Sequence, residues 1–158
     1  MANKFYTSEV TQKFSIDFSV KNAVKNASTS YGRLPKNIII IDAWAVCETE
    51  LGDADAGDDT TISIGYTGQA AAFYPATSID NMNAGTYLKL IPGVINVGSG
   101  QAITSVDTPA EVVAIARVSA DTHSGIVLTD VKELIIAASN DQNISEGKLH
   151  IFVKYYKF

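Results

Sequence analysis

Residues 37–50 read NIIIIDAWAVCETE, an apolar segment bounded by polar residues at both ends. Successive side chains of a β-strand point to opposite faces, and this alternation places apolar residues on both faces, interrupted by Asp42. A strand that is apolar on both faces is typical of the centre of a sheet. We therefore predict a central strand that is buried on both sides in its first half. One face holds Ile39, Ile41, Ala43, Ala45 and Cys47, and the other holds Ile38, Ile40, Trp44 and Val46.

The same period of two recurs on either side of this segment and predicts further strands at 13–20, 60–66 and 148–156. Shorter apolar runs, separated by turn-forming Gly, Pro, Asn, Asp and Ser, predict additional short strands. Many short strands with regular turns are typical of a β-sandwich or barrel, so we expect an all-β, antiparallel β-sandwich. The shorter runs lie at 87–91, 94–97, 102–106, 125–129 and 134–138.

Residues 108–118 leave two interpretations open. Thr108, Pro109 and Glu111 are suited to the N-cap, the first position and the capping box of a helix. The residues that follow are rich in β-branched side chains, which favour a strand. We favour the strand and keep one short helix as the alternative.

The alternation also predicts the core, because the inward face of each strand is the apolar one. If Trp44 lies in that core, its replacement by alanine should cost about 3–5 kcal/mol of stability. The residues expected to be mainly buried are Phe14, Ile16, Phe18, Ile39, Ile41, Trp44, Ile62, Ile64, Ile136, Ile151 and Val153.

Length and composition exclude several classes of protein. A chain of 158 residues is the size of one domain, and 46% apolar with 18% charged residues disfavours intrinsic disorder. One cysteine and two histidines are too few for a disulfide framework, a structural zinc site or an iron–sulfur cluster. The sequence shows no secretory signal and no apolar run of about 20 residues, so we expect no membrane association and synthesis in a reducing cytoplasm.

Charge divides the chain near residue 36. Residues 1–36 hold six basic and two acidic residues, a net charge of +4, whereas residues 37–158 hold six basic and fifteen acidic residues, a net charge of −9. We therefore describe 1–36 as a basic N-terminal arm with one strand, within or appended to the domain, and 37–158 as the sandwich body. The overall charge of −5 argues against nucleic acid as a partner. The arm is either an ordinary solvated face or a segment that docks on an acidic neighbour.

Catalytic and metal-binding chemistry is poorly represented. His150 lies in a predicted strand, His123 in a turn and Cys47 on an apolar face, so we predict no catalytic residue and treat a soluble enzyme as a minor hypothesis. The acidic run Asp53–Asp59 resembles the start of a calcium loop, but its twelfth position is Ile64 where such a loop needs glutamate. We predict no metal and no cofactor, with an irregular calcium site in this run as the alternative.

Aromatic residues near the ends of strands suggest a binding surface. They could line a sugar-binding groove or pack against a neighbouring subunit, since aromatic side chains are enriched at interfaces. These residues are Tyr66, Phe73, Tyr74 and Tyr87.

The order of several features resembles small β-sandwich virion proteins of tailed phages, of the capsid-decoration, auxiliary-capsid or head-fibre type. The resemblance spans residues 37–158 and rests on the strand at 37–49, the acidic turn at 52–59, the phrase TTISIGYTG at 60–68, AGTY at 84–87 and GKLHIFVKY at 147–155. It implies a jelly-roll-like sandwich without enzymatic activity, on the capsid surface, as a homo-oligomer bound to the major capsid protein or other head proteins. A head-fibre or tail component and a carbohydrate-binding module are the alternatives.

Combining charge and aromatic character gives a set of expected partner-binding residues. Basic residues of the arm would attract an acidic surface, and aromatic residues would supply apolar contact. The set is Phe5, Tyr6, Lys13, Lys21, Lys25, Arg33, Tyr66, Phe73 and Tyr74.

Overall fold

The computed structural model describes residues 8–54, 60–80, 82–90, 126–140 and 142–158, which form nine strands in two antiparallel sheets. The strands expected at 94–97 and 102–106 and the strand or helix at 108–118 lie outside these residues. No helix in the described part of the chain is long and apolar enough to span a membrane. The strands are β1 (Glu9–Asp17), β2 (Ala27–Leu34), β3 (Ile38–Asp53), β4 (Thr61–Tyr66), β5 (Gln69–Ser78), β6 (Tyr87–Leu90), β7 (Ile126–Leu128), β8 (Lys132–Ser139) and β9 (Ile144–Lys157).

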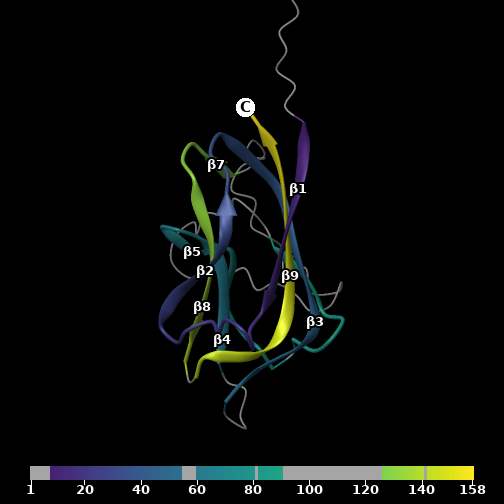
Figure 1. The fold of residues 1–158 in the computed structure, drawn as a ribbon, viewed down its shortest axis with the longest axis vertical. Coiled ribbons are helices and arrows are strands. Elements are labelled where there is room, and N and C mark those ends of the chain that lie inside the picture. The colour runs from purple at the N-terminus through teal and green to yellow at the C-terminus, as the bar shows by residue number, and fades with distance from the viewer. Residues whose placement is uncertain (1–7, 55–59, 81, 91–125, 141) are drawn as a thin grey trace, which may run out of the picture.

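The two sheets face each other as the layers of a sandwich, which confirms the predicted fold class (Figure 1). One sheet has the order β1-β9-β3-β6, with β7 also paired to β3, and the other has the order β2-β8-β4-β5. The first four strands therefore alternate between the two sheets. The chain then places β5 beside β4 in the same sheet and adds β6 and β7 to the other sheet, and its last two strands, β8 and β9, lie one in each sheet. This is a jelly-roll-like arrangement.

The pairing of β3 with β9 joins the two longest strands and contains a β-bulge that reverses part of the prediction. Ile40 pairs with Tyr155, but Asp42 pairs with the next residue along β9, so Ile41 is an extra residue in β3. The bulge shifts the alternation by one position. As a result Ile38 and Ile40 share the inner face with three small residues further along the strand, Ala43, Ala45 and Cys47.

The prediction that Ile39, Ile41 and Trp44 face the core is therefore wrong. Ile41 is 38% exposed, and Ile39 and Trp44 are half-buried on the outer face of the sheet. The prediction assumed that inward and outward residues alternate without interruption through residue 41, whereas the bulge interrupts this alternation there. The other predicted core residues are confirmed as buried: Phe14, Ile16, Phe18, Ile62, Ile64, Ile136, Ile151 and Val153.

Val20 is the last residue of the strand predicted at 13–20, but it lies beyond β1 and is 83% exposed. The strand ends at Asp17, whose carboxylate accepts a hydrogen bond from the backbone N–H of Ser19, and the Val20 N–H bonds to the Asp17 carbonyl. This turn rotates Val20 out of the strand pattern. Its neighbour Phe18 stays fully buried.

Sequence reasoning missed β2 and β5, which are edge strands of the same sheet. Their sequences, ASTSYGRL and QAAAFYPATS, are dominated by small residues. Edge strands present one side to solvent and bury less apolar surface, so their alternation is weak. A proline is tolerated at such an edge, as at Pro75 in β5.

Gly147 permits the close approach of β9 to β3. Its φ of +96° lies in the left-handed region, and a Cβ atom built there would lie 2.2 Å from the Glu50 carbonyl oxygen. Both the conformation and the contact require glycine.

We predict that Gly147→Ala lowers the free energy of unfolding by at least about 2 kcal/mol, because it adds backbone strain to a steric collision. Gly68→Ala is the matched control, since Gly68 has a φ of +95° but nothing within 4 Å of its Cβ position. Urea denaturation should show the larger loss for Gly147→Ala. Equal losses of unfolding free energy in the two variants would mean that the close contact with β3 does not contribute to the cost of Gly147→Ala.

We predict that Trp44→Ala costs about 1–2 kcal/mol, less than a fully buried aromatic residue would, because the ring is only half-buried and stacks on one neighbour. Ile64→Ala, at a position with 0% exposure, should cost about 2–5 kcal/mol. A denaturant melt in which Trp44→Ala is the more damaging of the two would contradict this assignment.

Candidate interaction surface

The outer face of the five-stranded sheet carries a row of side chains that crosses β1, β9, β3 and β6. The register aligns Lys13, Phe152, Trp44 and Lys89. The Trp44 and Phe152 rings are stacked, with centroids 5.2 Å apart and planes 9° apart. The Lys13 ammonium lies 5.6 Å from the Phe152 centroid. Because β9 runs between β1 and β3, Phe152 has the lysine on one side and the tryptophan on the other.

Ion pairs join neighbouring strands around this row. Lys89 lies 2.6 Å from Asp42, and Lys154 lies 2.8 Å from Glu9. Lys148 lies 3.8 Å from Asp17. All of these side chains are partly exposed, so each pair contributes little to stability. Their effect is to engage most of the charges of this face with one another.

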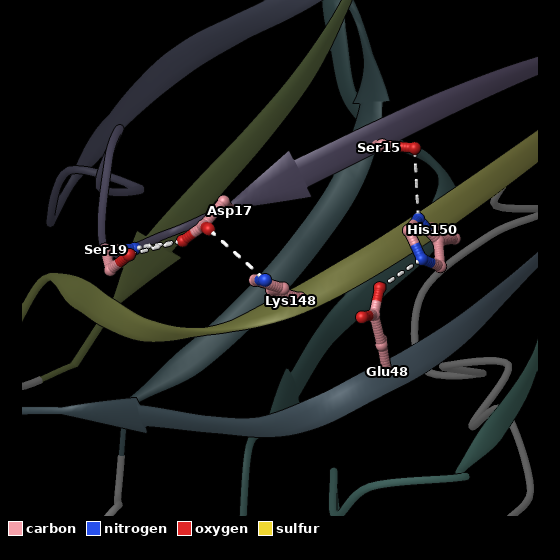
Figure 2. A network of polar contacts seen from close by, with 6 residues as sticks. All are labelled: Ser15, Asp17, Ser19, Glu48, Lys148 and His150. Carbon is pink, nitrogen blue, oxygen red and sulfur yellow. Dashed lines mark hydrogen bonds and ion pairs between the residues drawn. The ribbon is translucent and has the colours of Figure 1, made fainter.

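His150 on β9 connects the two neighbouring strands, β1 and β3, through polar contacts of its ring (Figure 2). Its Nδ1 lies 3.1 Å from Ser15 Oγ on β1, and its Nε2 lies 2.6 Å from Glu48 Oε2 on β3. A hydrolytic triad also needs N–H donors aimed at the substrate oxygen. The backbone N–H groups of these strands lie in the plane of the sheet and not above it. We therefore interpret the three residues as a cross-strand network, with His150 in a strand as predicted.

A groove of about 540 Å³ lies between the edge strands β1 and β2. It brings together two predicted partner-binding residues, Lys21 and Arg33. Lys21 bonds to the Ser30 carbonyl and lies 5.2 Å from the Tyr31 ring centroid, while the Arg33 Nε lies 4.0 Å from Glu133. Both cations therefore have a partner within the chain, although the Arg33 side chain stays 79% exposed.

The other predicted partner-binding residues are dispersed. Lys13 lies on the outer sheet face, and Lys25 lies half-buried in a bridge to β8. Phe5 and Tyr6 lie outside the described residues. Three aromatic members are buried in the core and present little surface to a partner or a sugar: Tyr66, Phe73 and Tyr74.

The structure places an unexpected apolar patch on the outer face of the five-stranded sheet, at the end where the described chain begins and ends. The register aligns Tyr156 of β9, Ile39 of β3 and Val127 of β7 in one row. Ile41 follows on β3 and Phe158 follows β9. We call these five residues the terminal patch. The continuous apolar run at 38–41 was the only sign of it in the sequence.

Metal-binding groups do not cluster among the described residues, where no three His, Cys, Asp or Glu side chains are placed to hold an ion. The acidic run at 53–59 falls mostly outside those residues. Cys47 is a buried side chain of the inner sheet face.

Chains in three solved phage capsid structures share this fold. "Cyanophage Pam1 capsid asymmetric unit" matches with a TM-score of 0.57 and 14% identity, over 100% of this chain and 91% of that one. "Acidic stable capsid structure of Helicobacter pylori bacteriophage KHP30" matches with 0.54 and 12%, over 96% and 90%. "Capsid of Ralstonia phage GP4" matches with 0.51 and 12%, over 100% and 90%. The sequence matches no family model and no curated protein. At these identities the similarity establishes a common fold.

Acid should weaken the outer face. Hydrogen bonds from Lys154 and Tyr156 hold the pKa of Glu9 below its ordinary value of 4.5, and a hydrogen bond from Ser19 followed by the charge of Lys148 lowers the pKa of Asp17. A lowered folded-state pKa gives a contribution to stability that is present above the unfolded pKa and is lost as pH falls through the folded one.

We therefore predict that Glu9→Gln flattens the fall in melting temperature between about pH 5 and pH 3 relative to the unmodified protein. Glu50→Gln, which removes an exposed carboxylate of β3 outside these ion pairs, is the control. Identical pH profiles for Glu9→Gln and the unmodified protein would show that the Glu9–Lys154 contact has no role in acid stability.

Burial raises the pKa of the Cys47 thiol to about 11. We predict that the folded protein at about pH 8 reacts with a thiol reagent at least about 100-fold more slowly than the urea-unfolded chain, because the thiolate is depleted and the sulfur is covered. Equal rates would place Cys47 at the surface.

Proposed function

We propose that this protein is a non-enzymatic structural protein of a bacteriophage virion, bound to the capsid as a decoration or auxiliary protein. The observation that carries the proposal is the likeness of fold to chains of three phage capsid structures, which extends over at least 90% of both partners in each comparison.

The outer sheet face supports the non-enzymatic part of the proposal. Its polar side chains are engaged in contacts between neighbouring strands, such as Glu48–His150–Ser15. The aromatic pair is also occupied, since Trp44 and Lys13 flank the Phe152 ring. Three of the four aromatic residues expected to line a sugar-binding groove, Tyr66, Phe73 and Tyr74, are also buried, which favours a structural role over carbohydrate binding.

The partners we propose are the major capsid protein or other head proteins, with further copies of this chain on the capsid surface. Synthesis would take place in the host cytoplasm. Both described strands of residues 1–36, β1 and β2, belong to the sandwich, and we propose that the segment of residues 1–7, which carries Lys4, Phe5 and Tyr6, is the part of the basic arm that contacts a partner. Attraction by such a charge aids docking, and apolar contact must supply most of the affinity.

The proposal predicts that particles produced from the phage genome encoding this sequence contain the chain in many copies. Mass spectrometry of purified particles measures the copy number, and labelling with an antibody in electron microscopy distinguishes head, fibre and tail. Purified protein should also rebind particles stripped of it, whereas an unrelated β-sandwich of similar size and net charge should not. Absence of the chain from purified particles would overturn the proposal.

A further inference from the structure

The terminal patch gathers a large share of the exposed apolar side chains of the described chain. Ile41 is 38% exposed, Val127 56%, Tyr156 37% and Phe158 59%. They come from β3, β7 and the end of β9, which meet at one end of the sandwich beside the start of β1 (Figure 1). Isolated exposed apolar residues are ordinary, but a cluster on one sheet face indicates an interaction site.

Charged groups border the terminal patch on one side without covering it. Lys154 and Tyr156 both bond to the Glu9 carboxylate, at 2.8 and 3.1 Å. The hydroxyl of Tyr156 is therefore satisfied within the chain, and its ring stays beside Ile39 in the aligned row. An occupant of the patch needs apolar side chains and no new charge partner.

The segment of residues 1–7, MANKFYT, carries apolar side chains beside one charge, Lys4, and it immediately precedes the described residue Ser8 at this end of the sandwich. It precedes Ser8 and Glu9, and Glu9 pairs directly with Tyr156. Seven extended residues span about 24 Å. Phe5, four residues before Glu9, reaches about 14 Å, which equals the roughly 14 Å across the three strand spacings from β1 to β7. Phe5 and Tyr6 are its large apolar side chains.

The sequence beside the segment favours a neighbouring copy over the same chain as the receiver. Residues 5–10 read FYTSEV and contain one residue, Ser8, of the types that support a tight reversal, with no Gly, Pro, Asn or Asp. Aromatic and β-branched residues favour extended backbone, which would continue the line of β1 beyond the end of its own sheet. A segment leaving in that direction meets another molecule.

We propose that residues 1–7 of one copy pack, through Phe5 and Tyr6, on the terminal patch of a second copy. The exchange is reciprocal in a two-fold dimer or runs head to tail in a closed ring. This inference concerns self-association alone and does not depend on attachment to a virion.

Analytical ultracentrifugation across a range of protein concentrations tests the proposal. The full chain should sediment as an oligomer, and deletion of residues 1–7 should yield the single chain of 16.9 kDa. Val127→Lys should weaken association about tenfold or more, because a charge would enter an apolar contact. Val20→Lys, at an 83% exposed position in the turn after β1, is the matched control and should associate like the full chain.

Engineered thiols identify the receiver of the segment. Cys47 is buried, so a chain with Tyr6→Cys and another with Val127→Cys each expose one thiol. Mixing them under mild oxidation should give a disulfide-linked heterodimer in excess of either homodimer. A disulfide within a single chain carrying both changes, together with a monomeric full-length protein, would overturn the proposal. So would unchanged association after deletion of residues 1–7. Rebinding to stripped particles is measured separately, so failure here leaves the proposed function intact.

Discussion

The extra residue at Ile41 determines how the rest of the sandwich is arranged around β3. By displacing the register with β9 by one position, it keeps Ile38, Ile40 and the small residues Ala43 and Ala45 on one face. Without the bulge, the charge of Asp42 would follow the two isoleucines into the core, which is costly for an unpaired carboxylate. With it, Asp42 lies outside and pairs with Lys89 on β6.

The same bulge separates two kinds of surface on the outer face. Beyond it, Trp44 stacks on Phe152 and the polar side chains pair across the strands, so this part of the sheet satisfies its own contacts. Before it, Ile39 and Ile41 lie on the outer side with Val127 and the ring of Tyr156, and their apolar surface stays partly exposed. The cross-strand contacts beyond the bulge allow that part of the sheet face to be exposed to solvent. The terminal patch is the part on which a second molecule would bind.

Prediction of the site from the sequence was limited by residues that change neighbours on folding. Tyr66, Phe73 and Tyr74 look like loop aromatics, but they lie in β4 and β5 and fill the core. Lys21 and Arg33 are twelve positions apart yet line one groove, because β1 and β2 are the facing edges of the two sheets. Charge and residue type identify candidates, but the register determines which of them meet.

The sequence by itself determined the fold class, because alternation of apolar and polar residues over β1, β4 and β9 is a local property of each strand. It also identified eight buried residues of the core, from Phe14 to Val153. Only the tertiary structure decided the facing of β3, since a bulge depends on the register with a partner strand more than 100 residues away. The terminal patch was decided in the same way. Its members come from β3, β7 and the end of β9, and only the pairing of those strands makes them neighbours.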